Sequence, residues 1–267
     1  MMSEIIKLSS PNTKEFWEIP ILFEDEALLA LEKPSRLLTS PDRYDPNRPN
    51  LMKLLHKDLE RNAPWVRPRK LTYLMNAHRL DFETSGIILL AKNKPALVFL
   101  ADLFGSEKPY KRYMAMVAGN GPVDEFTVDK ALSPHPVRLG EMKIDDKNGK
   151  KSKTLFKVVE KFRGFSLVEC VPLTGRTHQI RIHLKAHGTP ILGDTVYGGP
   201  PLMLSSIKRD FRLKPRKTEN ALMARVALHA TELRITSPAT NTEVTIQSEL
   251  PKDFRVALKY LRMFAPV

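Results

Sequence analysis

The densest set of chemically active side chains lies at residues 78–86, which read HRLDFETSG and contain one cation, two carboxylates and two hydroxyls. The apolar run that follows, residues 87–91, predicts a buried strand. Asp81 is therefore expected in a loop at the mouth of a rigid element, which is a good position for a catalytic carboxylate. A structural role explains the same residues, with Asp81 capping a turn and Arg79 pairing with it.

A second dense stretch, residues 174–184, reads TGRTHQIRIHL. Its spacing predicts a helix over residues 177–186, with His178, Arg181 and Lys185 on one face. An arginine on that face could hold a carboxylate elsewhere in the fold ionised and correctly turned. A solvated basic helix face is the plainer interpretation of this pattern.

Other chemistries fit the sequence less well. His183 and His187 have ligand spacing on the expected helix, but no acid lies between them and no third ligand is evident, so no metal site is expected. His183 is expected on the inward face of the helix instead. Cys170 lies in an expected strand without an adjacent base, which argues against a nucleophilic cysteine.

The composition indicates a soluble globular protein with a polyanionic partner. Of the 267 residues, 42% are hydrophobic and 27% charged, which is ordinary for a soluble domain. The net charge of +13 favours nucleic acid as the partner, although a basic surface without a binding role is also possible. A single cysteine allows no internal disulfide, and neither a signal peptide nor a membrane span is evident, so a cytoplasmic location is expected.

Basic residues cluster in two segments, which we expect to contact phosphates. The first cluster contains Lys208, Arg209, Arg212, Lys214, Arg216 and Lys217, and the second contains Arg61, Arg67, Arg69 and Lys70. Trp65 lies within the second cluster, where an aromatic ring suits base stacking, although core packing is the commoner role of a lone tryptophan.

The pattern of elements predicts an α+β fold with a mostly antiparallel sheet, because expected strands outnumber helices and short turns join them. Residues 1–20 are expected to form an arm and residues 21–267 one domain. Strands are expected at 21–33 (a hairpin), 87–91, 113–117, 154–159, 165–171, 226–236 and 243–247, helices at 51–60, 94–104, 177–186 and 252–264, and loops at 34–50, 133–152 and 200–222.

Three segments together resemble the RluA-type family of RNA pseudouridine synthases. They are HRLDFETSGIILLAK (78–92), KRYMAMVAG (111–119) and LTGRTHQIRIHLKAHGTPILGDTVYG (173–198), in the family's order. The resemblance implies that Asp81 is the catalytic aspartate, that Tyr113 stacks on the target base, and that Arg181 forms a salt bridge with the aspartate. It also implies the synthase catalytic fold, a mostly antiparallel sheet with a central cleft.

The implied reaction breaks the N1–C1′ bond of uridine, turns the uracil and joins C5 to C1′, so no cofactor is expected. One ionised carboxylate must act on C1′ as a nucleophile or on H2′ as a base, and the sequence does not choose between these. The uridine must first be flipped out of its stack. Arg79, Arg176 and His178 are expected to bind the substrate, which is ribosomal or transfer RNA, and a monomer is expected.

Two positions depart from the family pattern. Arg36 stands where the family usually has glycine, so the loop must change or this residue must adopt an unusual φ. Ser40 stands where a histidine is often found. Two other functions stay open: a non-catalytic RNA-binding relative, and a metal-dependent nuclease that uses Asp81 and Glu83. The presence of all three implied catalytic positions weighs against the first.

Overall fold

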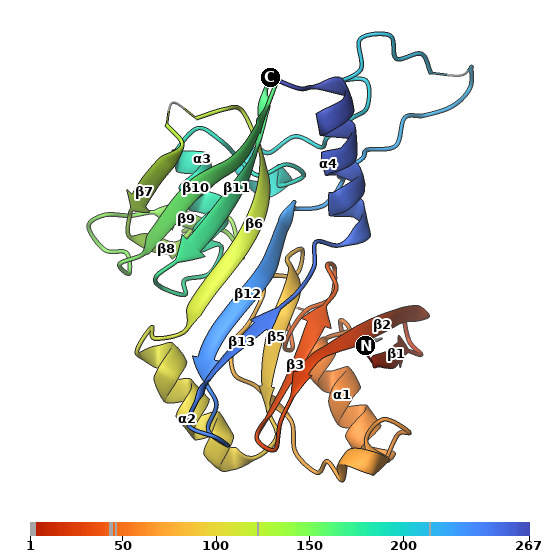
Figure 1. Ribbon diagram of the computed structural model, residues 1–267, viewed down its shortest axis with the longest axis vertical. Coiled ribbons are helices and arrows are strands. Elements are labelled where there is room, and N and C mark those ends of the chain that lie inside the picture. Colours follow the sequence, from red (N-terminus) through yellow and green to blue (C-terminus); the bar gives the residue numbers. More distant parts are fainter. Residues whose placement is uncertain (1–3, 43–44, 46, 122, 214) are drawn as a thin grey trace. The chain divides into compact units, whose positions relative to one another are not determined.

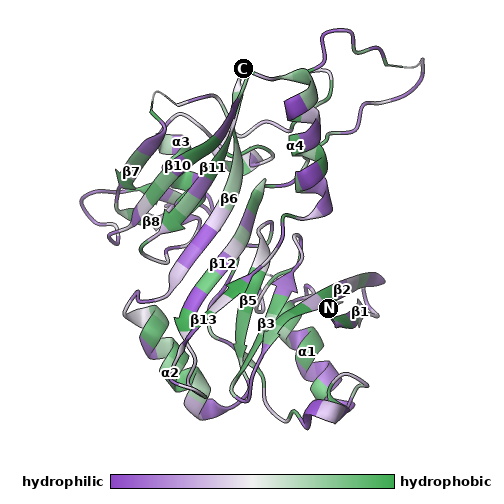
Figure 2. Cartoon of the chain, in the orientation of Figure 1, coloured by the Kyte–Doolittle hydropathy of each residue, from purple (hydrophilic) through white to green (hydrophobic). Residues whose placement is uncertain are grey.

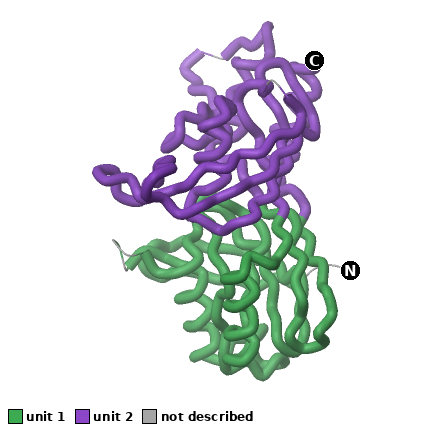
Figure 3. Tube along the Cα trace, turned by 90° about the vertical axis from the view of Figure 1, so that its left-hand side faces the viewer, with its two compact units in different colours: residues 1–111, 230–248 green, residues 112–229, 249–267 purple. Residues whose placement is uncertain are grey.

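The computed structural model describes residues 4–42, 45, 47–121, 123–213 and 215–267. The chain forms two compact units (Figure 3), and Figure 1 labels helices and strands of the chain. Unit 1 contains Met1–Lys111 and Ala230–Ser248, and unit 2 contains Arg112–His229 and Glu249–Val267. Pro46 and Lys214, which the sequence placed in a loop and in a basic cluster, lie outside the described residues.

Unit 1 is built on antiparallel strands. These are β1 (Ile5–Ser10), β2 (Glu15–Glu24), β3 (Leu28–Lys33), β4 (Met75–Asn76), β5 (Ser85–Ala91), β13 (Glu243–Gln247) and most of β12 (Leu228–Thr236). The strands β1, β2, β3 and β5 pair in that order, β4 also pairs with β5, and β13 pairs with β12. The remaining elements of the unit are α1 (Leu51–Glu60), η1 (Arg67–Arg69) and α2 (Lys94–Gly105).

Apolar side chains cover both faces of strands β3 and β5, which are largely hydrophobic in Figure 2. Leu29, Leu31, Ile88 and Leu90 belong to the core cluster that includes α1. Leu28, Ala30, Ile87 and Leu89 belong to the cluster that includes α2. Successive strand residues point to opposite faces, so a strand that is buried on both faces reads as a continuous apolar run. This is why residues 87–91 predict a strand correctly.

The segment expected to form an N-terminal arm lies within this sheet. Strand β1 alternates exposed and buried residues, and Ile6 and Leu8 point into the core together with Ile19 of β2. From Ile5 onward the segment is therefore a strand of unit 1 rather than an arm. The physical reason is that its alternating apolar side chains cover the same core as α1.

Unit 2 contains a second set of antiparallel strands. Strands β6 (Tyr110–Ala118), β11 (Phe165–Pro172), β10 (Lys153–Phe162) and β7 (Glu125–Asp129) pair in that order, and β8 (Leu132–Pro134) pairs with β9 (Met142–Ile144). The helical elements are α3 (Gln179–Ala186), η2 (Thr195–Tyr197) and α4 (Lys252–Phe264). The segment 133–152, expected to be a loop, thus contains a small hairpin, whose side chains pack against Ile182 and Tyr197.

The helix bounds follow the sequence pattern closely. Helices α1 and α4 have the expected bounds, and α2 extends one residue further than expected. Helix α3 begins at Gln179, two residues later than expected, because His178 adopts a left-handed φ of 54°. Within the described ranges, no helix combines the length and the hydropathy needed to cross a bilayer.

Candidate active site

The loop that carries Asp81 is pinned on both sides by hydrogen bonds within unit 1. The Thr39 hydroxyl donates to the carbonyl of Leu80 at 3.1 Å and accepts the Leu80 N–H at 3.2 Å. On the other side, the Thr84 N–H donates to the carbonyl of Asp81 at 3.2 Å, one residue before β5 begins. Asp81 itself is half-buried. A fixed backbone and partial access to solvent are what a carboxylate needs to act on a bound substrate.

Arg36 supports the same loop from the segment that follows β3. Its N–H donates to the carbonyl of Phe82 at 2.7 Å, and its guanidinium lies 3.6 Å from the Glu83 carboxylate. Its φ is 61°, in the left-handed region that favours glycine. The loop therefore keeps a glycine-like backbone at this position, and Arg36 adopts the unusual φ.

Gly86 fixes the start of β5, directly after the motif. Its φ is 113°, and a side chain at this position would overlap the backbone of Ala230 in β12. Only glycine satisfies both conditions. The glycine of HRLDFETSG therefore allows the close approach of two strands that places the Asp81 loop.

His78 anchors the beginning of the motif. Its Nε2 accepts the N–H of Leu89 at 3.1 Å, and its ring stacks on Phe104 with 4.8 Å between centroids. Burial of the ring, and then the nearby charge of Lys111, lower the pKa of His78 to about 4. His78 is therefore neutral at pH 7 and acts as a hydrogen-bond acceptor for strand β5.

Arg79 is exposed and forms no ion pair with any described residue. The structural alternative in which Arg79 pairs with Asp81 is therefore wrong for this part of the chain. An exposed cation two residues from the candidate acid is available to a polyanionic substrate.

Arg181 is held inside unit 2 by a buried carboxylate. Its Nε lies 2.7 Å and its Nη2 2.9 Å from the two carboxylate oxygens of Asp194. The side chains are 6% and 1% exposed. This bidentate pair fixes the plane and direction of the guanidinium. Because Asp81 belongs to unit 1 and Arg181 to unit 2, the salt bridge between them stays a prediction.

Tyr197 connects this ion pair to His178. Its N–H donates to the Asp194 carboxylate at 3.3 Å, and the Arg181 guanidinium lies 4.9 Å from its ring centroid. Its hydroxyl accepts the N–H of Met142 at 3.0 Å and lies 2.7 Å from Nδ1 of His178. The sequence placed His178 and Arg181 on one helix face. The structure joins them in one network with Asp194 and Tyr197, which the sequence did not single out.

Gln179 fixes the turn that leads into α3. Its side-chain oxygen accepts the Thr174 hydroxyl at 2.6 Å and the Arg176 N–H at 3.0 Å. Its side-chain nitrogen donates to the Lys153 carbonyl and to the Thr154 hydroxyl, both at 3.0 Å. All four hydrogen-bonding positions of a buried amide are satisfied, which explains why the TGRTHQ segment needs Gln179.

Arg176 and Tyr113 are each partly exposed in unit 2. The Arg176 Nε donates to the Lys151 carbonyl at 3.1 Å, so one donor of this guanidinium is used in a hydrogen bond within the protein. Tyr113 lies on β6 at the edge of the unit 2 core, opposite Cys170 of β11. Burial raises the pKa of the Cys170 thiol well above its usual value, which does not suit a nucleophile.

His183 is a core histidine, as the sequence pattern favoured. Its Nδ1 lies 2.9 Å from the Thr154 hydroxyl and its Nε2 3.0 Å from the Ser152 hydroxyl, and its side chain is fully buried. His187 stacks on Phe126 instead, with 3.6 Å between ring centroids. Within the described part of the chain, no three residues of the usual ligand types gather into a group that could hold a metal ion.

The two basic clusters differ in their surroundings. In the first, the exposed side chains without an ion pair among the described residues are Arg209, Arg212, Arg216 and Lys217. In the second, Arg61 pairs with Asp58 at 2.6 Å, and Arg69 contacts two glutamates, Glu4 at 2.6 Å and Glu24 at 2.8 Å. Arg67 and Lys70 of the second cluster are also exposed without an ion pair among the described residues, so the first cluster offers the larger number of uncompensated cations.

The interpretation of Trp65 as a base-stacking residue is wrong. Its side chain packs in the unit 1 core at 8% exposure, and its indole N–H donates to Asp58 at 2.6 Å. A buried indole needs a partner for its N–H, and Asp58 provides one. The cations around Trp65 therefore surround a packing residue.

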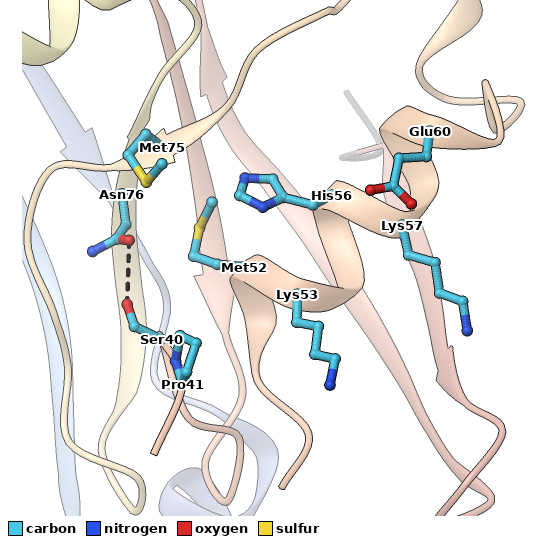
Figure 4. Close-up of a pocket in the computed structure, with 9 residues that line it drawn as sticks. All are labelled: Ser40, Pro41, Met52, Lys53, His56, Lys57, Glu60, Met75 and Asn76. Carbon is cyan, nitrogen blue, oxygen red and sulfur yellow. Dashed lines mark hydrogen bonds between the residues drawn. The ribbon is translucent and has the colours of Figure 1, made fainter. Parts of the chain in front are cut away.

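Unit 1 contains a pocket beside α1, with a cavity volume of about 670 Å³ (Figure 4). Its lining consists of Ser40, Pro41, Met52, Lys53, His56, Lys57, Glu60, Met75 and Asn76. Asn76 joins it to the Asp81 loop, because its amide donates to the His78 carbonyl at 3.0 Å and its oxygen accepts the Ser40 hydroxyl at 3.2 Å. None of the six site residues expected from the sequence lines this pocket.

Comparison with known proteins places the chain in a family. Residues 27–186 match the family model described as RNA pseudouridylate synthase. The chain is 33% identical to ribosomal large subunit pseudouridine synthase D of Zymomonas mobilis, over 96% of this chain and 77% of that protein. It is 32% identical to the dual-specificity RNA pseudouridine synthase RluA of Salmonella typhimurium, over 90% of this chain and 96% of that protein.

A solved structure agrees with this assignment. Human RNA pseudouridylate synthase domain containing 4 superposes with a TM-score of 0.66 at 25% identity, covering 91% of this chain and 92% of that chain. The sequence-based prediction of the family and of its α+β fold is confirmed. The chain belongs to the RNA pseudouridylate synthase family, and it is an isomerase that converts uridine in RNA to pseudouridine.

Proposed function

We propose that the chain modifies specific uridines in structured RNA, ribosomal or transfer, with Asp81 acting at the ribose of a flipped-out nucleotide. The observation that carries the proposal is the support of Asp81, whose loop is pinned by Thr39 on one side and by the start of β5 on the other. Among the relatives, one is named for the large ribosomal subunit and another as a dual-specificity RNA enzyme.

The proposed reaction keeps every atom of the substrate, except that the hydrogen on C5 is lost and N1 gains a proton. The N1–C1′ bond breaks with help from the Asp81 carboxylate, as nucleophile at C1′ or as base at H2′. The freed uracil turns against the ring of Tyr113, and C5 then bonds to C1′. On the nucleophilic route this step breaks the ester bond between Asp81 and C1′, and on the base route Asp81 returns the proton to C2′. The proton on C5 leaves to solvent and N1 takes up a proton, so neither a redox partner nor a group donor enters the balance.

Arg181 is proposed to orient Asp81 and to favour its charged form. Asp194 binds Nε and Nη2 of the guanidinium, which fixes the direction from which Arg181 would meet the catalytic carboxylate. A charge-assisted hydrogen bond from a fixed guanidinium stabilises the ionised carboxylate.

RNA binding is proposed to use exposed cations of both units. The exposed arginines and lysine of the 208–217 segment supply one set, and Lys53 and Lys57 at the pocket of unit 1 supply another. Arg79, Arg176 and His178 would contact the RNA nearer the target uridine. Contacts to phosphates set affinity and orientation more than sequence choice.

The test is to incubate purified protein with unmodified transcripts of ribosomal and transfer RNA, and to map pseudouridine chemically. We expect new pseudouridine at a small number of defined uridines. Tight RNA binding without any pseudouridine on either class of transcript would contradict the proposal and favour a non-catalytic RNA-binding protein. Activity that disappears with a strong chelator would favour metal-dependent chemistry at Asp81 and Glu83.

A further inference from the structure

The Arg181–Asp194 ion pair is more deeply buried than an ion pair needs to be for stability alone. Placing two charges in a protein interior costs several kcal/mol per ion, and their attraction often only offsets that cost. The pair Arg225–Asp253 in the same unit has similar bidentate distances, 2.6 and 2.9 Å, but its carboxylate side chain is 42% exposed. The deeper burial of the Arg181–Asp194 pair therefore calls for a further explanation.

The turn that carries Asp194 is built to hold its carboxylate in one place. A side chain at Gly193 would overlap the backbone of Arg225, and one at Gly199 would overlap the backbone of Ile191. The Asp194 N–H donates to the Ile191 carbonyl at 3.1 Å, and its carboxylate accepts the N–H of Tyr197. The backbone and the side chain of Asp194 are thus both held by contacts that do not involve Arg181.

The same residues also restrain the partner of Asp194. Arg181 lies over the ring of Tyr197, and the hydroxyl of that ring is tied to His178 and to Met142. The Arg181 guanidinium is held at two nitrogens by Asp194 and lies against the ring of Tyr197. It cannot turn without breaking these contacts. Such preorganisation matters for a residue that must present a hydrogen bond in one direction.

We propose that Asp194 is a positioning residue of the isomerisation: it fixes the Arg181 guanidinium so that this group can orient the catalytic carboxylate of Asp81. The inference rests on the proposed role of Arg181. Asp194 does not touch the substrate in this account, and its effect on the reaction passes entirely through Arg181.

The decisive test is a double-mutant cycle of Asp194→Asn and Arg181→Met. Single-turnover rates, RNA affinity and folded fraction are measured for each protein. We expect Asp194→Asn to lower the single-turnover rate about 100-fold with RNA affinity changed less than threefold, because misplacing an orienting group acts on the chemical step. The double variant should turn over no more slowly than Arg181→Met alone, because both changes remove one function.

Asp253→Asn is the matched control, since it removes one carboxylate from a bidentate arginine pair of the same unit. It should change stability without changing the single-turnover rate of the folded protein. If Asp194→Asn does not fold, Asp194→Glu keeps the charge but displaces the carboxylate by one methylene, and a slowed rate in a stable protein is expected.

The outcomes separate the two proposals. If Arg181→Met slows the reaction but Asp194→Asn, or Asp194→Glu in its place, turns over at the wild-type rate, the positioning role is overturned while the proposed function stands. Additive rate losses in the double variant would also overturn it. If Arg181→Met itself retains full turnover, the proposed role of Arg181 fails, and the inference about Asp194 fails with it.

Discussion

The guanidinium of Arg181 and the carboxylate of Asp194 meet at 2.7 and 2.9 Å in a pair that solvent scarcely reaches. The two residues are 13 positions apart, one on α3 and the other at the start of η2. The family motif identifies the arginine, whereas its carboxylate partner becomes evident only from the fold. The reaction is therefore expected to depend on residues that never contact RNA.

The glycine of the HRLDFETSG motif should be intolerant of any side chain. Gly86→Ala is expected to lower the free energy of unfolding by at least about 3 kcal/mol, because the new Cβ would overlap Ala230 and the φ of 113° is strained for alanine. Urea unfolding measures the change. Gly105→Ala is the control, since nothing surrounds that position at the end of α2, and it should be neutral or stabilising. Equal stability of the two variants would refute this account of the motif.

The left-handed backbone at Arg36 should lower the stability of the folded protein, and glycine at this position should remove that strain. Because its φ is 61°, Arg36→Gly is expected to be more stable than Arg36→Ala by about 1 kcal/mol. Both variants lose the exposed ion pair with Glu83, so the comparison isolates the backbone. Thermal unfolding of the two proteins is the measurement. An alanine variant as stable as the glycine variant would show that the loop relaxes out of the left-handed region.

The buried histidine His229 should make unit 2 sensitive to acid. Burial, followed by the charge of Arg225, lowers its pKa to about 4 from an ordinary value near 6.5. Between pH 6.5 and 4 the unfolded chain binds a proton that the folded chain does not, so stability is complete above pH 6.5 and falls as the pH drops. His229→Gln should reduce the slope of stability against pH in that window. An unchanged slope in urea titrations would exclude His229 as a source of the acid sensitivity.

RNA affinity should depend on salt through the exposed cations of the 208–217 segment. Replacing Arg209, Arg212, Arg216 and Lys217 with glutamine is expected to weaken binding and to reduce the slope of log K against log salt by up to about 3. The control replaces Lys153, Lys157 and Lys161 of β10, each of which already pairs with an acidic side chain. That control should leave the slope nearly unchanged. The same slope in both proteins would mean that this segment does not contact phosphates.

Much of the fold was predictable because its signals are local. Helix α1 was predicted from its amphipathic pattern, and the structure adds an Asn50 cap that accepts the Lys53 N–H. Strand β5 reads as an apolar run. Strands β1 and β7 were missed because their alternation is short and half of their side chains are exposed. Nothing local distinguishes such a segment from a polar loop until its partner strand is known.

The candidate site was predictable only where a motif exists. Asp81 and Arg181 follow from HRLD and HQIR, and the structure explains Gln179 of the second motif through its four hydrogen bonds. Asp194 and Tyr197 lie within the resembling stretch at 173–198, yet their connection to Arg181 depends on how the turn after α3 folds back. The sequence left both stacking and packing open for Trp65, because an aromatic ring among cations looks the same whether its indole faces solvent or Asp58, and the structure shows packing.

The central claim is that one carboxylate, Asp81, carries out the chemistry. Release of tritium from RNA labelled at C5 of uridine reports the new C5–C1′ bond directly, because forming it expels the hydrogen on C5. We expect the wild-type protein to release tritium, Asp81→Asn to release none while still binding RNA, and Glu83→Gln, altered two residues away, to retain most of the activity. Tritium release by Asp81→Asn at the wild-type rate would contradict the account.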